Sequence, residues 1–275
     1  MAVKTPLKWV GSKFRVLPQL LPHLPEGKRL VEPFAGSCSV MLNTEYDEYL
    51  IGDVNPDLIA LYKAIAANPY DVIDWARILF ENYNHAAGYY INRDSFNHND
   101  DPAWRPALFL YLNRHCFNGL CRYNKAGSFN VPYGKYKKPY FPEAEILAFA
   151  EKARRATFVC SSYVHTLGMV AEGDVVYCDP PYLTVGGNFT AYHESGFNLM
   201  DHGKLSRKLR QLASAGVTVV ASNSDLELVH HLYSGFERIG ITAPRSVGAA
   251  ANSQKAAPEL ILKMTGMIAG GGIHA

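Results

Sequence analysis

The sequence predicts an α/β protein in which a parallel sheet is built in two parts around an inserted module. Three observations predict this fold. Short apolar strand candidates alternate with helical segments in the opening part of the chain, the alternation stops near residue 69, and it resumes at Pro142. We therefore expect one domain made of residues 1–55 and 143–275, and an inserted domain made of residues 56–142.

The composition is that of an ordinary globular protein, with 48% hydrophobic and 19% charged residues in a chain of 275. Its longest apolar runs are far shorter than the roughly 20 residues of a membrane-spanning helix, so we expect no membrane association. The first residues lack the apolar stretch of a secretory signal, and we expect a cytoplasmic protein. Neither the five cysteines nor the ten histidines show the spacing of a metal site or a disulfide framework, and we expect no metal.

The first part of the sheet is predicted from two strand candidates and the segments that follow them. Residues 28–34 form a short apolar strand, and residues 35–39 are small enough for a tight turn at a helix start. A second strand, residues 49–52, ends at Asp53. Asn55 followed by Pro56 gives a helix cap and a proline in the first turn, and apolar spacing extends the helix to about Ala67.

The inserted segment has a charge distribution unlike that of the rest of the chain. From Pro102 to Pro142 there is no acidic residue, so this segment carries +7 and leaves −5 for the remainder. The basic residues are Arg105, Arg114, Arg122, Lys125, Lys135, Lys137 and Lys138. Aromatic residues capable of stacking are interleaved with them: Phe117, Tyr123, Phe129, Tyr133, Tyr136 and Tyr140. A solvated lysine-rich loop is the alternative, but the rings favour contact with nucleic acid. Alternation over residues 128–133 predicts a β-hairpin.

Helix and strand candidates return after Pro142. We expect a helix over residues 143–156, a strand over 157–161 and a buried strand over 174–178. A further helix and three strands complete the sheet, at residues 204–216, 217–222, 236–241 and 259–264. Residues 243–257 are expected to form a loop, and the last ten residues a frayed tail.

Two of the predicted strand ends indicate an adenosine-containing ligand. Ligands of open α/β sheets bind at the carboxyl ends of strands, where the strand order reverses. Gly36 allows close backbone approach, and Asp53 follows it by 17 residues, close to the offset at which an acid meets ribose hydroxyls. A nicotinamide cofactor is the alternative, but the full glycine pattern of such sites is absent.

The third strand end, Asp179-Pro180-Pro181-Tyr182, indicates chemistry on an amine. Its two prolines remove backbone donors, so the loop offers hydrogen-bond acceptors. The lone pair of an exocyclic base amine is delocalised into the ring. If the Asp179 carboxylate and the Pro180 carbonyl each accept a hydrogen bond from one N–H of the amine, the lone pair can point at a methyl donor. Tyr182 offers a face on which the base can stack. A turn capped by the aspartate is the alternative, but it explains neither the second proline nor the tyrosine.

Together these motifs resemble the Dam-type family of bacterial and bacteriophage DNA adenine-N6 methyltransferases. The similar segments are LKWVGSK, PFAGS, GDVN, DPPY, LYLNR, NGLCRYN, FNVP and KKPYFPEAE, and the resemblance extends from about Leu7 to Met264. It implies a Rossmann-like S-adenosylmethionine-dependent methyltransferase sheet with an inserted, mainly helical DNA-recognition domain carrying a β-hairpin. It also implies S-adenosylhomocysteine as product, no obligate protein partner, and double-stranded DNA as substrate. The target would be N6 of a flipped adenine within GATC.

The resemblance assigns roles position by position. It implies catalysis by Asp179, Pro180, Pro181 and Tyr182, and cofactor binding by Trp9, Lys13, Phe34, Gly36, Asp53 and Asp179. It implies DNA contacts by Lys8, Phe117, Asn118, Leu120, Arg122, Pro132, Lys135 and Tyr136. Lys137 and Lys138, which follow the hairpin as flexible point charges, are expected to contact phosphates. The chain departs from the family pattern in its GSCS turn, in its His115-Cys116-Phe117 segment and at Lys135.

Three other functions are alternatives at this stage. Methylation of a protein glutamine amide is disfavoured, because enzymes of that kind have an asparagine at the position of Asp179. A DNA-binding module without activity would have lost the acid or the aromatic residue of the motif, and both are present. An RNA methyltransferase would be expected to favour splayed single strands, whereas the hairpin resemblance favours duplex DNA.

Overall fold

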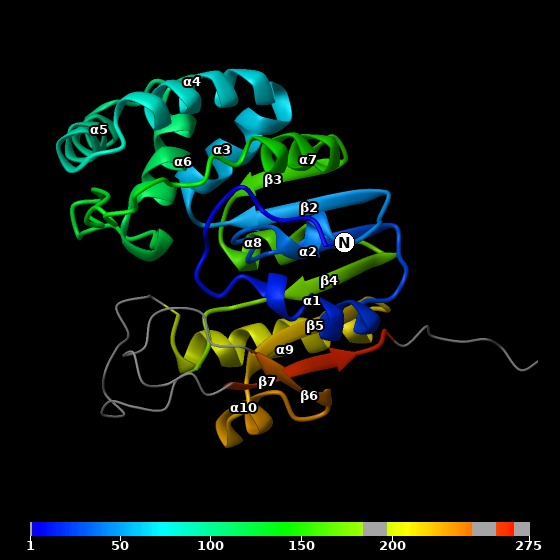
Figure 1. Ribbon diagram of the computed structural model, residues 1–275. Helices are drawn as coiled ribbons and strands as arrows, with labels where there is room; N and C mark the ends of the chain where they lie inside the picture. The colour runs from blue at the N-terminus through cyan, green and yellow to red at the C-terminus, as the bar shows by residue number, and fades with distance from the viewer. Residues whose placement is uncertain (1, 184–196, 244–256, 267–275) are drawn as a thin grey trace, which may run out of the picture.

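The computed structural model describes residues 2–183, 197–243 and 257–266. Within these residues, seven strands form one sheet in the order β3-β2-β1-β4-β5-β7-β6 (Figure 1). Strands β1 to β5 are parallel, and β7 runs antiparallel to both β5 and β6. The strands are β1 (Arg29–Glu32), β2 (Glu48–Asp53), β3 (Ala156–Cys160), β4 (Asp174–Cys178), β5 (Thr218–Ser224), β6 (Glu237–Ala243) and β7 (Ala257–Met264).

Side chains of the central strands alternate between two hydrophobic cores. In β2, Tyr49 and Ile51 belong to one core and Leu50 belongs to the other. Successive residues of a strand point to opposite faces, so a strand buried on both faces is largely apolar. Strand β4 is buried at all five positions, and its one charged residue, Asp174, is paired with Arg29.

Helices cover both faces of the sheet. The helices that contribute to the first core include α1 (Leu17–Leu20), α2 (Ser39–Leu42), α3 (Pro56–Ala67) and α7 (Glu143–Ala153). The opposite face is covered by α8 (Tyr163–Gly168), α9 (Leu199–Ser214) and α10 (Glu227–Leu232). The remaining helices, α4 (Pro69–Asn82), α5 (Ala86–His98) and α6 (Arg105–His115), extend the first core and lie beyond α3 at one end of the sheet (Figure 1).

Three short 3-10 turns complete the described helical segments: η1 (Lys13–Arg15), η2 (Leu21–His23) and η3 (Phe117–Gly119). The prediction of helix α3 is confirmed from first residue to last. The Asn55 side chain accepts hydrogen bonds from the backbone amides of Asp57 and Leu58, which is the capping geometry expected of this residue.

Other predicted boundaries differ from the structure. Helix α9 begins at Leu199 rather than Lys204, because Asn198 and Asp201 form a capping box one turn upstream. Strand β1 ends at Glu32 rather than Phe34 because the backbone turns there. The short helices α8 and α10 were not predicted, since six residues leave little periodicity to detect.

The predicted hairpin at residues 128–133 is present in an irregular form. Backbone hydrogen bonds from Asn124 to Ser128 and from Asn130 to Arg122 pair the chain across a turn, and isolated antiparallel bridges join Cys116 to Tyr133 and Tyr123 to Phe129. Side-chain bonds take the place of a longer ladder. The Asn124 carboxamide oxygen accepts from the backbone amides of Ala126 and Ser128, which tightens the turn between the bridges.

The strand order reverses between β1 and β4, as in Rossmann-like folds. From β1 the chain proceeds to β2 and β3 on one side, and then crosses to β4 and β5 on the other. The arrowheads of β2 and β4 point toward the side of the molecule where the segment after α6 lies (Figure 1), and β1 is parallel to both strands. The Rossmann-like α/β fold predicted from the sequence is thus confirmed, and its strand ends face the inserted segment.

Candidate active site

The turn after β1 is held by the end of β2. The Asp53 carboxylate accepts from the backbone amide of Gly36 at 3.1 Å and from that of Asn55 at 2.9 Å. Gly36 has a φ of +46°, and a Cβ placed on it would lie 2.9 Å from the indole nitrogen of Trp9. The absence of a side chain at Gly36 therefore lets Trp9 lie directly against the turn.

The catalytic residues predicted from the third strand end meet the N-terminal segment. The ammonium of Lys13 lies 3.0 Å from Asp179 Oδ1 and 4.7 Å from the centre of the Tyr182 ring. Burial raises the pKa of Asp179, and the nearby Lys13 ammonium opposes that rise. The ion pair thus favours a carboxylate that can accept hydrogen bonds.

Pro180 is buried and Pro181 is exposed, so only one side of the loop is open. The Tyr182 hydroxyl donates to Glu259 on β7 at 3.0 Å. This contact ties the aromatic residue of the motif to the antiparallel part of the sheet, and it was not predicted from the sequence.

A second buried acid, Glu32, lies at the end of β1. It is 2% exposed, and its Oε1 has no hydrogen-bond partner among the described residues. Burial raises the pKa of Glu32 to about 8, and the charge of Asp179 adds to the rise. Sequence reasoning did not single out this residue, although it directly precedes the PFAGS motif and a charged residue at a buried strand end is itself a signal.

Aromatic side chains line the same edge of the sheet. Phe34 stacks on Tyr163 with ring centres 5.3 Å apart and meets Phe197 edge-on at 5.6 Å. Phe34 remains partly exposed, which leaves it able to contact a ligand. Tyr163 and Phe197 come from elements that sequence reasoning did not connect to the site.

The predicted DNA contacts come together on residues 116–138, which we call the recognition loop. Lys8 is joined to it through Tyr136, since its ammonium lies 3.8 Å from the centre of that ring, and the Lys8 backbone exchanges hydrogen bonds with the side chain of Asn113 on the preceding helix α6. Asn118 and Lys135 both have positive φ, and the Asn118 amide donates to the Tyr136 hydroxyl. The exposed predicted residues are Phe117, Arg122, Pro132, Lys135, Lys137 and Lys138, while Lys8, Asn118, Leu120 and Tyr136 are half-buried.

Arg122 is exposed but not free to rotate. Its Nε donates to Asn130 Oδ1 at 2.7 Å, and its Nη2 donates to the Asn130 carbonyl at 3.3 Å. A guanidinium held in this way retains other N–H groups that can meet an acceptor outside the protein.

Two of the seven basic residues are not part of the exposed basic surface, and this corrects the sequence-based interpretation. Arg105 pairs with Asp57, and Arg114 is only 7% exposed, with burial lowering its pKa to about 10. Its guanidinium donates to the Pro6 carbonyl and so fastens the N-terminal segment to α6. Phe129 is likewise buried, so it is a core residue rather than a stacking surface.

Other kinds of site receive no support from the described residues. They contain no group of three or more histidine, cysteine or acidic side chains placed to hold a metal ion. No helix in the described ranges is both long and apolar enough to cross a membrane.

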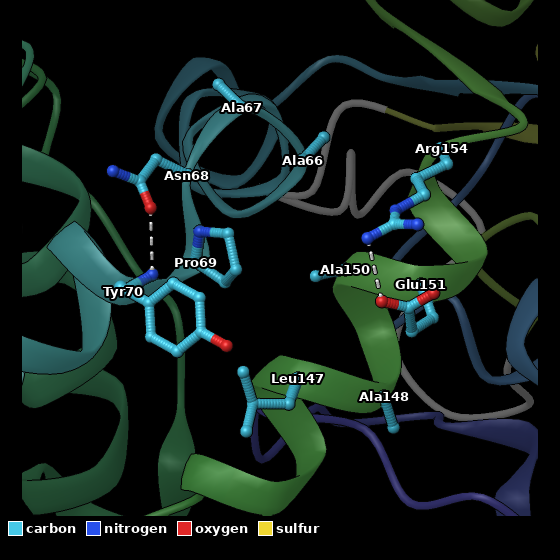
Figure 2. Close-up of a pocket in the computed structure, with 10 residues that line it drawn as sticks. All are labelled: Ala66, Ala67, Asn68, Pro69, Tyr70, Leu147, Ala148, Ala150, Glu151 and Arg154. Atoms are coloured by element: carbon cyan, nitrogen blue, oxygen red, sulfur yellow. Dashed lines mark hydrogen bonds and ion pairs between the residues drawn. The ribbon is translucent and has the colours of Figure 1, made fainter.

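Figure 2 shows a pocket of about 520 Å³ between α7 and the junction of α3 with α4. Its lining includes Ala66, Pro69 and Tyr70 on one side and Leu147 and Arg154 on the other. The pocket lies at the end of α3 opposite Asn55, and we do not assign it to the site at the strand ends.

Comparisons with known proteins agree with this geometry. A family model described as D12 class N6 adenine-specific DNA methyltransferase matches residues 9–247. The chain is 51% identical to a retron Ec67 DNA adenine methylase of Escherichia coli, with 94% of this chain and 90% of that protein covered. It is 47% identical to a DNA adenine methylase of Serratia marcescens, over 88% of this chain and 91% of that one. It is 44% identical to the DNA adenine methylase of Escherichia coli strain K12, over 93% of each.

Proposed function

The chain belongs to the D12 class N6 adenine-specific DNA methyltransferase family, and from this we propose that it methylates an adenine flipped out of duplex DNA within GATC. We also propose that S-adenosylmethionine, the methyl donor that the family implies, binds across the ends of β1, β2 and β4. The observation that carries the proposal is the convergence of Gly36, Asp53 and Asp179 at adjacent strand ends.

The residues at these strand ends fit the proposed cofactor. Its methionine part carries an ammonium group and its sulfur is cationic, and the unpartnered Oε1 of Glu32 is a buried acceptor that suits a cationic donor. Each carboxylate oxygen of Asp53 accepts one hydrogen bond from a backbone amide, and each can accept a further one from a ribose hydroxyl. Trp9, Lys13 and Phe34 would complete this site.

When bound, S-adenosylmethionine supplies an electrophilic methyl group. The task of the protein is to prepare the adenine amine for it. Asp179 and the Pro180 carbonyl accept hydrogen bonds from the two N6–H groups, so that the nitrogen lone pair is less delocalised into the ring, and one N6 proton leaves once the amine is methylated. Tyr182 stacks on the base, while Lys13 holds the Asp179 carboxylate in its charged form.

The recognition loop supplies the contacts to duplex DNA. In the proposed complex, the fixed guanidinium of Arg122 reads a guanine in the major groove, where an arginine can meet O6 and N7 together. The exposed Lys137 and Lys138 neutralise phosphates. Phe117, which is 49% exposed, is placed to wedge into or stack on the bases beside the flipped adenine.

The experiment is a methyl-transfer assay with labelled cofactor and four acceptors: duplex DNA, single-stranded DNA, RNA and protein. Incorporation into the duplex alone is expected, at adenine N6. Sequencing that detects methylated adenine across an expressed plasmid then identifies the site. Methylation at sites other than GATC would contradict the proposed recognition sequence, and label in RNA or protein would contradict the proposed substrate.

A further inference from the structure

Two residues that immediately follow Asp53 make direct contacts with the recognition loop. The Asn55 carboxamide nitrogen donates to Cys121 Sγ at 3.3 Å. The Asp57 carboxylate accepts from the Tyr123 hydroxyl at 2.6 Å. Each of these hydrogen bonds joins two residues that lie 66 positions apart in the chain, and together they connect the segment after Asp53 with the recognition loop.

Both the backbone and the side chain of Asn55 are held by hydrogen bonds. Its backbone amide donates to Asp53 Oδ1 at 2.9 Å, and its side-chain oxygen caps helix α3. The same Asp53 carboxylate holds the Gly36 turn. A change in the position of Asp53 is therefore transmitted to Asn55 and to the first turn of α3, where Asp57 lies.

Asp57 is held as firmly as Asn55. It is 5% exposed, and its second oxygen accepts from Arg105 Nε at 2.7 Å. Arg105 is fixed in turn by the carbonyls of Phe96 and Asn99. A buried carboxylate paired in this way has little freedom, so the Tyr123 hydroxyl bonds to a fixed point.

The two contacts are made by the sequence neighbours of Arg122, the residue proposed to read a base. Cys121 and Tyr123 flank it in the sequence, and both side chains are tied to the segment 55–57 while the Arg122 guanidinium is exposed. Burial raises the pKa of the Tyr123 phenol, which therefore remains a donor to Asp57.

We propose that Asp57 and Tyr123 are positioning residues that couple cofactor binding to DNA recognition, by setting the place of Arg122 relative to Asp53. The inference rests on the proposed function, because it requires that Asp53 contacts the cofactor and that Arg122 contacts DNA. Coupling of this kind is reciprocal: the cofactor raises the affinity for DNA by the same factor by which DNA raises the affinity for the cofactor.

The test measures that coupling factor with the unreactive product S-adenosylhomocysteine. The dissociation constant of a GATC duplex is determined by fluorescence anisotropy with and without saturating product. For the wild-type protein, we expect binding to be about fivefold tighter or more when the product is present. Tyr123→Phe removes only the hydroxyl. In this variant the coupling factor, which is the ratio of the DNA dissociation constants without and with product, should fall below about twofold. The affinity of the free protein for the product should change by less than about twofold.

Tyr111→Phe is the matched control. Tyr111 is a buried tyrosine of α6 whose hydroxyl donates to the Tyr83 carbonyl at 2.7 Å, with no link to Asp53. This variant should keep the wild-type coupling factor. If Tyr123→Phe does not fold, Cys121→Ala decides the question, since it removes the bond from Asn55 and should also reduce the factor.

Three outcomes would overturn the inference. They are a wild-type coupling factor near one, a coupling factor in Tyr123→Phe equal to that of the wild type, and a loss of DNA affinity in Tyr123→Phe that is the same with and without product. The last of these would mean that Tyr123 merely supports the loop. Methyl transfer by the wild-type protein is measured separately. Absence of that transfer contradicts the proposed function, whereas an active enzyme without coupling contradicts only this inference.

Discussion

At the scale of single residues, the half-buried Asp179 has one fixed positive partner. Burial raises its pKa, and the Lys13 ammonium at 3.0 Å keeps the charged form accessible. To accept a hydrogen bond from an amine N–H group the acid has to be charged, because a neutral carboxyl group would itself donate a hydrogen bond. Its ion pair and its place after the buried β4 therefore fit the role of acceptor in the proposed reaction.

The first prediction concerns Asp179→Ala. We expect methyl transfer to be lost, because one of the two acceptors for the amine protons is removed. The measurement is turnover with saturating cofactor and duplex. Residual turnover within about tenfold of the wild-type value, equivalent to roughly 1.4 kcal/mol in the barrier, would contradict the role.

Glu32 gives a second prediction, based on the sign of its pKa shift. Its pKa in the folded protein is raised to about 8 from an ordinary value of 4.5. Between these two pH values the folded state keeps a proton that the unfolded state loses, so the contribution of Glu32 to stability falls as pH rises through this window. A cationic cofactor group beside Glu32 would favour its charged form and expel that proton.

Affinity for the cofactor product should therefore rise with pH up to about 8, by as much as about tenfold per unit. Glu32→Gln should remove this part of the dependence. Calorimetric titration of both proteins with S-adenosylhomocysteine at three pH values measures it, and the variant corrects for titration of the ligand itself. Identical pH dependence in the two proteins would show that Glu32 does not face the ligand.

At the scale of structural elements, the recognition loop separates two kinds of basic residue. Arg122 is fixed by Asn130, whereas Lys138 is exposed and has no ion pair among the described contacts. A fixed guanidinium can distinguish bases, while a flexible ammonium acts as a point charge toward phosphate. Replacing Arg122 should therefore change how methylation depends on the DNA sequence, whereas replacing Lys138 should change how DNA binding depends on salt.

Arg122→Ala should reduce methylation of the preferred duplex far more than methylation of duplexes with one base changed, with about 1–3 kcal/mol of discrimination lost. Lys138→Ala should weaken binding to all duplexes alike and reduce the slope of log affinity against log salt by about one. A panel of single-substitution duplexes at several salt concentrations measures both. An equal slowing of every duplex by Arg122→Ala would rule out base reading.

Elements governed by local signals could be predicted from the sequence, and those governed by distant partners could not. Helix α3 is specified by Asn55 and Pro56, which cap and start it. The burial of Arg114 depends on the Pro6 carbonyl, 108 residues away, and no neighbouring residue indicates it. The same holds for Glu32 within the candidate site: its partners Met41 and Asp179 become neighbours only once the sheet has formed.

At the scale of the whole molecule, the proposal assigns catalysis to the sheet and DNA recognition to the inserted segment. The proposed catalytic motif lies at the end of β4, near the middle of the sheet, whereas the recognition loop follows α6 at one end of the molecule (Figure 1). The N-terminal segment joins the two parts, with Lys8 bound to Asn113 and Lys13 paired with Asp179. In the proposed complex, a duplex bound by the loop therefore presents its adenine to a site on another part of the protein.

That separation leads to the last prediction. An adenine paired within a duplex cannot place N6 against Asp179 and Pro180 at a strand end, so the base must leave the helix. The energetic cost of unstacking, a few kcal/mol, would be offset by stacking on Tyr182 and by the acceptors of the motif. With 2-aminopurine replacing the target adenine, binding of the wild-type protein should increase its fluorescence, because the probe is quenched while stacked. The increase should be absent when the probe occupies a neighbouring position in the same duplex. Fluorescence that stays quenched at the target position would contradict flipping and would require the duplex to reach β4 intact.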